Sequence, residues 1–199
     1  MNLQNLKLFY ILSCVLLGLI ILSPTFFAAV PFPESEMFSE LWLLGSNHMI
    51  ENGSLNVVLN RPYSVYLGVG NHMAGLEYYK VFVKFRSQSQ AFNETGTVLL
   101  SSLKPIFEYR LFLKNNETWE KDFMFSFENV SFEGNVSRVS MISINGNDVN
   151  LDNILVRDEL DGGFYCQMFF ELWIFNSTIS DFQYHNRSVW FWLNLDQML

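Results

Sequence analysis

The feature that most constrains this chain is an uncharged run of 23 residues near its N-terminus, from Leu8 to Val30. A helix rises about 1.5 Å per residue, so this run spans roughly 34 Å, enough to cross a hydrocarbon core of about 30 Å. The run therefore predicts one transmembrane helix over about residues 8–30. It divides the chain into an anchor region, residues 1–33, and a body, residues 34–199.

A cleavable signal peptide is the alternative interpretation of the same run. Lys7 provides a short basic segment before it, and small residues, Ala28 and Ala29, lie near its end. Cleavage after either alanine would place Phe26 or Phe27 three positions back, where a small residue is needed. The run is also longer than the usual apolar segment of about 7–15 residues. The sequence therefore favours a retained anchor.

Charges on the two sides of the run predict its orientation. Lys7 and the α-amino group precede it, and the next basic residue is Arg61. The positive-inside rule then places the N-terminus in the cytoplasm and the body outside the cell membrane. From Glu34 onward the chain has 11 basic and 20 acidic side chains, a formal net charge of −9. This balance argues against nucleic acid and anionic lipid as partners of the body.

The acceptor pattern for N-linked glycans, Asn-x-Ser/Thr, supports an extracellular body. It occurs more often than the roughly two matches that the Asn, Ser and Thr content gives by chance. The seven asparagines are Asn52, Asn93, Asn116, Asn129, Asn135, Asn176 and Asn186. Asparagine and serine are also common in turns, so each match has a purely structural interpretation as well. Asn186 fits glycosylation least well, because an expected strand follows almost at once.

Alternation of apolar and polar side chains recurs along the body between turn signals. In the stretch 78–85, for example, Val81 and Val83 face one way and Lys80 and Lys84 the other. The expected strands are 41–44, 64–69, 78–85, 106–113, 123–127, 141–144, 165–175 and 189–195. With an aromatic content of 17%, this predicts an all-β body. We expect an immunoglobulin-like β-sandwich of about 7–9 strands, with a barrel as the less favoured alternative.

Glycine marks two of the breaks between these strands. Asn145-Gly146 predicts a tight hairpin, and Gly162-Gly163 marks another turn. We expect the irregular stretches 87–97 and 145–161 to form long loops.

The two cysteines predict no internal disulfide. Cys14 lies inside the expected membrane helix and Cys166 lies in the body, so the two thiols cannot meet. Cys166 sits in an apolar stretch and is expected to be a buried, unreactive side chain.

The acidic residues give no sign of catalysis. Asp158, Glu159 and Asp161 cluster before the Gly162-Gly163 turn, where charged side chains are usually solvated. The sequence contains no glycine-rich phosphate loop and no nucleophile elbow. We therefore expect neither enzyme activity nor a cofactor.

The three histidines suggest a metal site as one alternative. The tripeptide Asn-His-Met occurs twice, around His48 and His72, and the remaining histidine is His185. Imidazole together with thioether is a ligand set that suits copper. Nothing in the spacing requires these side chains to converge, and strand ends are ordinary places for polar residues.

The tryptophans near the C-terminus suggest a binding surface. Trp190 and Trp192 share one face of the expected strand 189–195 and would form a flat platform for sugar rings or a partner. Both faces of the last two strands are apolar, however, as in a covered central strand. A place in the core is therefore the favoured interpretation of both tryptophans.

Four further stretches of the sequence share a pattern with a known family: Ser39 to Gly45, Tyr66 to His72, Gly163 to Trp173 and His185 to Arg187. They resemble the outer domain of an archaeal membrane protein family, the domain of unknown function sixteen-sixteen. The resemblance implies an archaeal cell-surface sandwich that is N-glycosylated and has no assigned activity. Family members commonly have several transmembrane helices before this domain, whereas one is expected here.

The sequence thus predicts a membrane-anchored cell-surface protein without catalytic activity, which either contacts a protein or glycan partner or is a structural part of the envelope. Its acidic, acceptor-rich body favours this function. A copper-binding module and a glycan-binding sandwich remain the alternatives.

Overall fold

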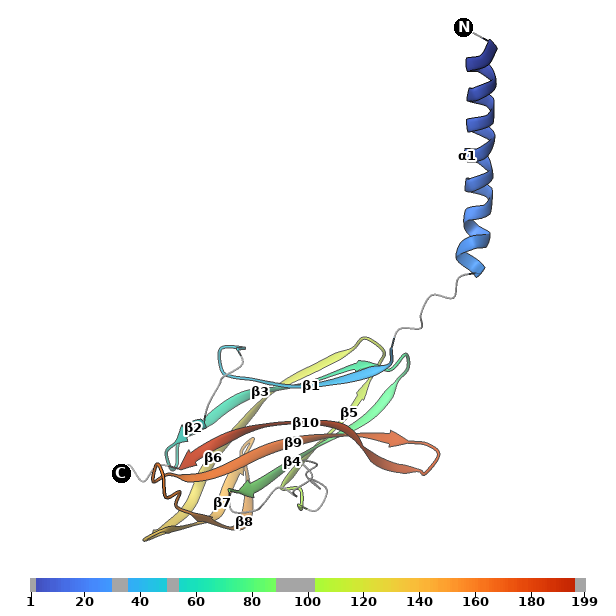
Figure 1. The fold of residues 1–199 in the computed structure, drawn as a ribbon. Coiled ribbons are helices and arrows are strands. Elements are labelled where there is room, and N and C mark those ends of the chain that lie inside the picture. Colours follow the sequence, from blue (N-terminus) through green and yellow to red (C-terminus); the bar gives the residue numbers. More distant parts are fainter. Residues whose placement is uncertain (1–2, 30–35, 50–53, 89–102, 196–199) are drawn as a thin grey trace. The chain divides into compact units, whose positions relative to one another are not determined.

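The computed structural model describes residues 3–29, 36–49, 54–88 and 103–195 (Figure 1). The chain divides into two compact units, residues 1–36 and residues 37–199.

The first unit is a single helix, α1 (Leu3–Ala29). Its side chains are exposed at every position from Leu8 to Leu12, which is more than one full turn, and apolar residues continue exposed to Ile21. Apolar surface therefore covers all sides of the helix. In the described part of the chain, no helix meets the length and apolarity required to cross a membrane.

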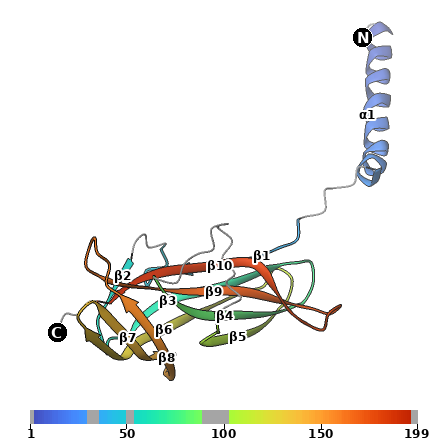
Figure 2. The same ribbon diagram turned by 60° about the horizontal axis from the view of Figure 1, so that its bottom comes forward.

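The described residues of the second unit form two five-stranded sheets. Sheet A has the order β1-β3-β6-β7-β8, formed by β1 (Phe38–Leu44), β3 (Tyr63–His72), β6 (Thr118–Glu133), β7 (Val136–Ile144) and β8 (Asn147–Val156). Sheet B has the order β2-β10-β9-β4-β5, formed by β2 (Ser54–Val57), β10 (Asp181–Leu195), β9 (Phe164–Asn176), β4 (Glu77–Ser87) and β5 (Phe107–Leu113). Figure 2 shows both sheets from a second direction. The all-β prediction and the two-layer sandwich are confirmed.

The strand pairing is antiparallel except between β2 and β10, which run parallel. In sheet B the order β10-β9-β4 matches the G-F-C order of immunoglobulin domains. Sheet A departs from that pattern at its far edge, where β6, β7 and β8 follow one another as a meander.

The core lies between the sheets and is rich in phenylalanine. On β6 the alternating residues Phe123, Phe125 and Phe127 point inward and are fully buried. The predicted alternation of β4 is also confirmed, since Val81 belongs to the same core. Cys166 is buried there as expected, and its burial raises the pKa of the thiol well above the usual value.

One predicted loop is wrong. Most of 145–161 is the strand β8, joined to β7 by a tight hairpin in which Asn145 and Gly146 both have positive φ. The hairpin prediction at this dipeptide is therefore confirmed. The strand was hidden because β8 is the edge of sheet A and carries many Asn and Asp side chains, which are rare in strands but common on exposed edges. The other predicted loop, 87–97, extends past Gln88 into residues outside the description.

The described residues form ten strands rather than 7–9. The additional strands are β8 and the four-residue β2, which is too short to show an alternating pattern.

Candidate functional site

The outer face of sheet B carries both C-terminal tryptophans. On β10, Val189, Phe191 and Leu193 pack against the core, so period-two geometry turns Trp190 and Trp192 outward. Trp190 is 54% exposed. The prediction that the two share a face is confirmed. Their expected place in the core is wrong, because the residues between them already occupy the inward positions.

This outer face also buries charge. Lys84 Nζ lies 2.8 Å from Glu171 Oε2, and the two side chains are 1% and 0% exposed. The indole of Trp173 donates a hydrogen bond to the same carboxylate oxygen at 3.0 Å. Nearby, the guanidinium carbon of Arg86 lies 5.7 Å from the ring centroid of Trp192. Outward-facing charges on β4 and β9 are thus packed among aromatic rings rather than solvated.

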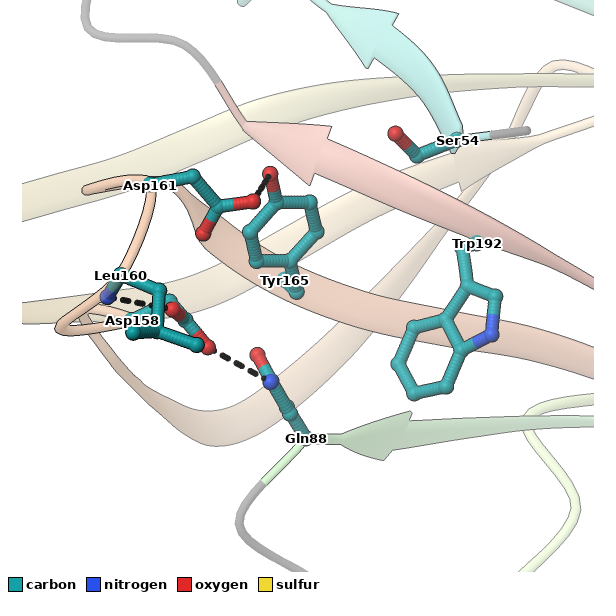
Figure 3. A pocket seen from close by; sticks show the side chains of 7 residues that line it. All are labelled: Ser54, Gln88, Asp158, Leu160, Asp161, Tyr165 and Trp192. Atoms are coloured by element: carbon teal, nitrogen blue, oxygen red, sulfur yellow. Dashed lines mark hydrogen bonds between the residues drawn. The ribbon is translucent and has the colours of Figure 1, made fainter.

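A pocket of about 410 Å³ opens beside Trp192 at one end of this face. Its walls come from β2, β9, β10, the residue after β4, and the turn between β8 and β9 (Figure 3). The lining residues are Ser54, Gln88, Asp158, Leu160, Asp161, Tyr165 and Trp192. We refer to it as the Trp192 pocket.

Strand register explains how these distant residues meet. Ser54 lies beside Trp192 in the parallel pairing of β2 with β10. Gln88 directly follows β4, and its backbone N–H donates to the carbonyl of Tyr165 on β9 at 3.2 Å. The pocket therefore stands on three hydrogen-bonded strands of one sheet.

The β8–β9 turn supplies the acidic wall. The Asp158 N–H donates to the Gly163 carbonyl at 2.8 Å, and the Gly162 N–H donates to the Asp158 carbonyl at 3.1 Å. Arg157 Nε donates to the Gly162 carbonyl at 2.7 Å. Gly162 has a φ of 74°, a conformation that glycine adopts without steric cost. These bonds hold the turn in one shape, with Leu160 at its tip 97% exposed.

The two acids of the pocket are fixed by specific donors. The Leu160 N–H donates to Asp158 Oδ1 at 2.8 Å, and Gln88 Nε2 donates to Oδ2 at 2.9 Å. These donors lower the pKa of Asp158, the Leu160 N–H first and the Gln88 amide second. The Tyr165 hydroxyl donates to Asp161 Oδ2 at 2.9 Å, and this bond raises the pKa of Tyr165. Figure 3 shows all three bonds on the pocket wall.

The pocket combines an aromatic wall with donors and acceptors. Trp192 and Leu160 offer apolar surface, while Ser54 and Gln88 offer a hydroxyl and an amide. Such a combination suits a ligand that has both an apolar face and hydroxyl or amine groups.

Two of the predicted histidines lie far apart. His48 stacks on Tyr66, with 3.7 Å between ring centroids, and His72 Nε2 lies 3.5 Å from Glu40 Oε2. Tyr66 pairs with the last residue of β1 and His72 with the first. The two imidazoles therefore mark opposite ends of this ladder, roughly 20 Å apart at strand spacing.

His185 belongs to a hydrogen-bonded chain that joins the sheets. Its Nε2 lies 3.0 Å from Ser39 Oγ, which lies 2.7 Å from the Tyr79 hydroxyl. That hydroxyl donates to Asn71 Oδ1 at 3.1 Å. Burial, and then the charge of Arg187, lower the pKa of His185. Among the described residues no group of three or more His, Cys, Asp or Glu is placed to hold a metal ion. The copper site stays a prediction that elemental analysis tests.

The glycan acceptors that the structure describes lie at the surface. Asn116, Asn129, Asn135 and Asn186 are exposed. Asn176 is half-buried, and its Nδ2 donates to Gln183 Oε1 at 3.0 Å. Asn186 has a positive φ in a bulge of β10, a turn-like geometry just before the predicted strand 189–195. Asn52 and Asn93 lie outside the described residues.

Four pocket residues were not singled out from the sequence: Ser54, Gln88, Leu160 and Tyr165. The cluster of Asp158 and Asp161 before two glycines was noticed, but as a solvated turn. The turn follows the edge strand β8 and leads into β9, which pairs with the tryptophan-bearing strand β10. This placement depends on the order of strands in the sheets, which no local sequence pattern predicts.

The described body is a two-layer β-sandwich. A comparison with solved structures finds similarities at low identity and low TM-score. A beta-glucosidase from Listeria innocua is 10% identical, with a TM-score of 0.37 over 82% of this chain and 17% of that chain. The ASH / PapD-like domain of human CEP192 is 10% identical, with a TM-score of 0.32 over 85% and 93% of the two chains. The CooA pilin subunit from enterotoxigenic Escherichia coli is 10% identical, with a TM-score of 0.25 over 78% of this chain and 95% of that chain.

This chain spans less than a fifth of the glucosidase chain. At these identities and TM-scores the likenesses carry no argument about ligand or activity. No protein-family model and no curated protein matches the chain.

Proposed function

We propose that this chain is a membrane-anchored module that binds a glycan outside the cytoplasm through the Trp192 pocket. The observation that carries the proposal is the pocket itself, in which an indole wall stands beside hydrogen-bonding groups from several strands. A sugar ring needs both. Its C–H face packs on an aromatic ring, and its hydroxyls donate and accept hydrogen bonds.

The anchor rests on the sequence and on the surface of α1. Apolar side chains exposed on all sides of a helix need an apolar environment. The uncharged run 8–30 also continues beyond the side chains that the structure describes. Lys7 before the run, and the lack of Lys and Arg in the sequence after it until Arg61, support a cytoplasmic N-terminus and an external body.

The experiment for the pocket uses the full chain in detergent micelles and a panel of neutral, cationic and anionic oligosaccharides. We expect at least one sugar to bind, and Trp192→Ala to weaken it about tenfold or more, since the ring face is lost. Phe112→Ala is the matched control, because this aromatic residue is exposed on the same sheet. Unchanged sugar binding by a folded Trp192→Ala variant, or no binding to any sugar, contradicts the proposal.

The anchor has its own experiment. We expect the chain to stay with membranes through alkaline extraction and the body to be digested by a protease added to intact cells. Release of the chain by alkali, with the N-terminal run cleaved off, would show a signal peptide instead.

A further inference from the structure

The charge of the Trp192 pocket narrows the kind of sugar that fits it. Among the described residues that line the pocket, Asp158 and Asp161 are carboxylic and none is basic. Two arginines lie nearby. Arg86 is almost fully buried beside Trp192, and the Arg157 Nε–H group is directed to the Gly162 carbonyl. The described pocket surface is therefore acidic.

The carboxylates keep acceptor capacity for a ligand. Each carboxylate oxygen can accept about two hydrogen bonds. Asp158 receives the Leu160 N–H on Oδ1 and the Gln88 amide on Oδ2, and Asp161 receives the Tyr165 hydroxyl on Oδ2. The backbone and side chain of Asp161 also hydrogen-bond with the Asp158 carboxylate. The donors that they already have hold both side chains in place without filling all of their acceptor sites. The stabilised ionised form of Asp158 keeps this wall negative at neutral pH.

The aromatic wall strengthens the same preference. The face of an indole attracts a cation, and it also attracts the C–H groups of a sugar ring. A ligand with a positive group on a pyranose ring would meet both kinds of attraction in one pocket. A uronic acid or a phosphorylated sugar would instead face two carboxylates with no cation on the lining.

We propose that the Trp192 pocket takes a sugar residue with a free amine, whose ammonium group contacts Asp158 and Asp161 while the ring lies against Trp192. This inference rests on the proposed glycan binding and specifies the class of glycan.

The experiment titrates the full chain with three oligosaccharides of equal length. They are a glucosamine tetramer, its fully N-acetylated counterpart and a galacturonic acid tetramer. We expect the glucosamine tetramer to bind at least about tenfold more tightly than the N-acetylated one, and the galacturonic acid tetramer not to bind. Added salt should reduce the difference, since the pocket is open to water.

Two substitutions test whether the preference comes from the pocket. Asp158→Asn and Asp161→Asn keep the size of each side chain and a carbonyl oxygen, so we expect each to reduce the preference and the double variant to abolish it. Asp152→Asn is the matched control, because Asp152 is exposed on sheet A. A calcium titration of the same variants distinguishes an amine site from a simple cation site.

The outcomes separate the two proposals. Equal binding of the amine and N-acetyl sugars overturns the amine inference and leaves glycan binding intact. A preference that survives both pocket substitutions reflects the net charge of the body and also overturns the inference. If calcium binds in a way that requires both Asp158 and Asp161 but does not block sugar binding, the two acids form a metal site. This outcome also overturns the amine inference. If no tetramer and no other sugar binds, glycan binding itself fails.

Discussion

The outer faces of the two sheets both carry ion pairs, but the pair on sheet A is exposed and the pair on sheet B is buried. On sheet A the pair Arg138–Asp152 is exposed, with 3.6 Å between Nε and Oδ1, whereas on sheet B the pair Lys84–Glu171 is buried. Exposed charges on sheet A keep that face in water. On sheet B the charges and rings pack together, and the pocket lies at the edge of this packed area.

The tryptophans of the two faces differ in the same way. Trp42 on sheet A lies over Gly68, and its Nε1 donates to Glu120 Oε2 at 3.1 Å. Trp192 on sheet B instead forms a wall of a pocket. Trp42 can lie flat on its sheet because Gly68 has no side chain beneath it. Trp192 instead borders a pocket because polar residues of neighbouring segments surround it.

The largest expected effect comes from the buried ion pair. Glu171→Ala leaves the Lys84 ammonium buried without its carboxylate, so we expect the free energy of unfolding to fall by about 3–5 kcal/mol. Arg138→Ala breaks the exposed pair of sheet A and should cost less than about 1 kcal/mol. Urea denaturation followed by tryptophan fluorescence measures both. Equal losses for the two variants would contradict the difference between the faces.

The second expected effect distinguishes the two sides of β10. Leu193→Ala creates a cavity between the sheets and should lower the free energy of unfolding by about 2–5 kcal/mol. Trp190→Ala removes a ring that is mostly in solvent, and we expect a change below about 1 kcal/mol. Denaturant midpoints of the two variants check this. A larger loss in the free energy of unfolding for Trp190→Ala than for Leu193→Ala would indicate that Trp190 is part of the core.

The third expected effect concerns the glycine beneath Trp42. A β-carbon at Gly68 would overlap the Trp42 indole, so Gly68→Ala should displace the ring and cost about 1–3 kcal/mol. At Gly70 the nearest atom is the carboxylate end of Glu40, which can move aside, so Gly70→Ala should cost less. Thermal unfolding and the Trp emission maximum compare the two. Equal emission spectra for wild type and Gly68→Ala would argue against this packing.

The smallest expected effect is a pH dependence at the junction of the sheets. Burial and Arg187 lower the pKa of His185 from its ordinary value of 6.5, so the unfolded chain binds the proton more tightly. The stability contributed by neutral His185 should therefore be complete above about pH 6.5 and be lost as the pH falls through the lowered pKa. His185→Gln should flatten this part of the curve. An unchanged slope in the variant would assign the pH dependence to other groups.

Much of the sandwich could be predicted because local alternation reports which face of a strand is covered. Phe123, Phe125 and Phe127 occupy every second position of β6, and this period of two predicts that they face the core together. The pattern fails where apolar residues occupy successive positions. On β9 this occurs because both faces are covered, whereas on β10 the apolar outer face includes the exposed Trp190. For this reason the side on which Trp190 lies could not be predicted.

The pocket was less predictable than the fold. Its residues come from segments between Ser54 and Trp192, and they meet only through the parallel pairing of β2 with β10 and the neighbouring positions of β9 and β4. Long-range pairing of this kind leaves no mark on the local sequence. The turn at Gly162-Gly163 was visible, whereas the cavity beside it was not.

The position of β2 has a mechanical consequence. Chain enters the body at β1, which pairs along its whole length with β3, and β2 then pairs with β10 beside the pocket. A pull along β1, applied at residue 37 against a ligand held near Trp192, would load the backbone hydrogen bonds of both pairs in shear. All bonds of a ladder then share the force, whereas a pull across the strands would open them one at a time. The pairs β1–β3 and β2–β10 are thus suited to bear a load directed along their strands.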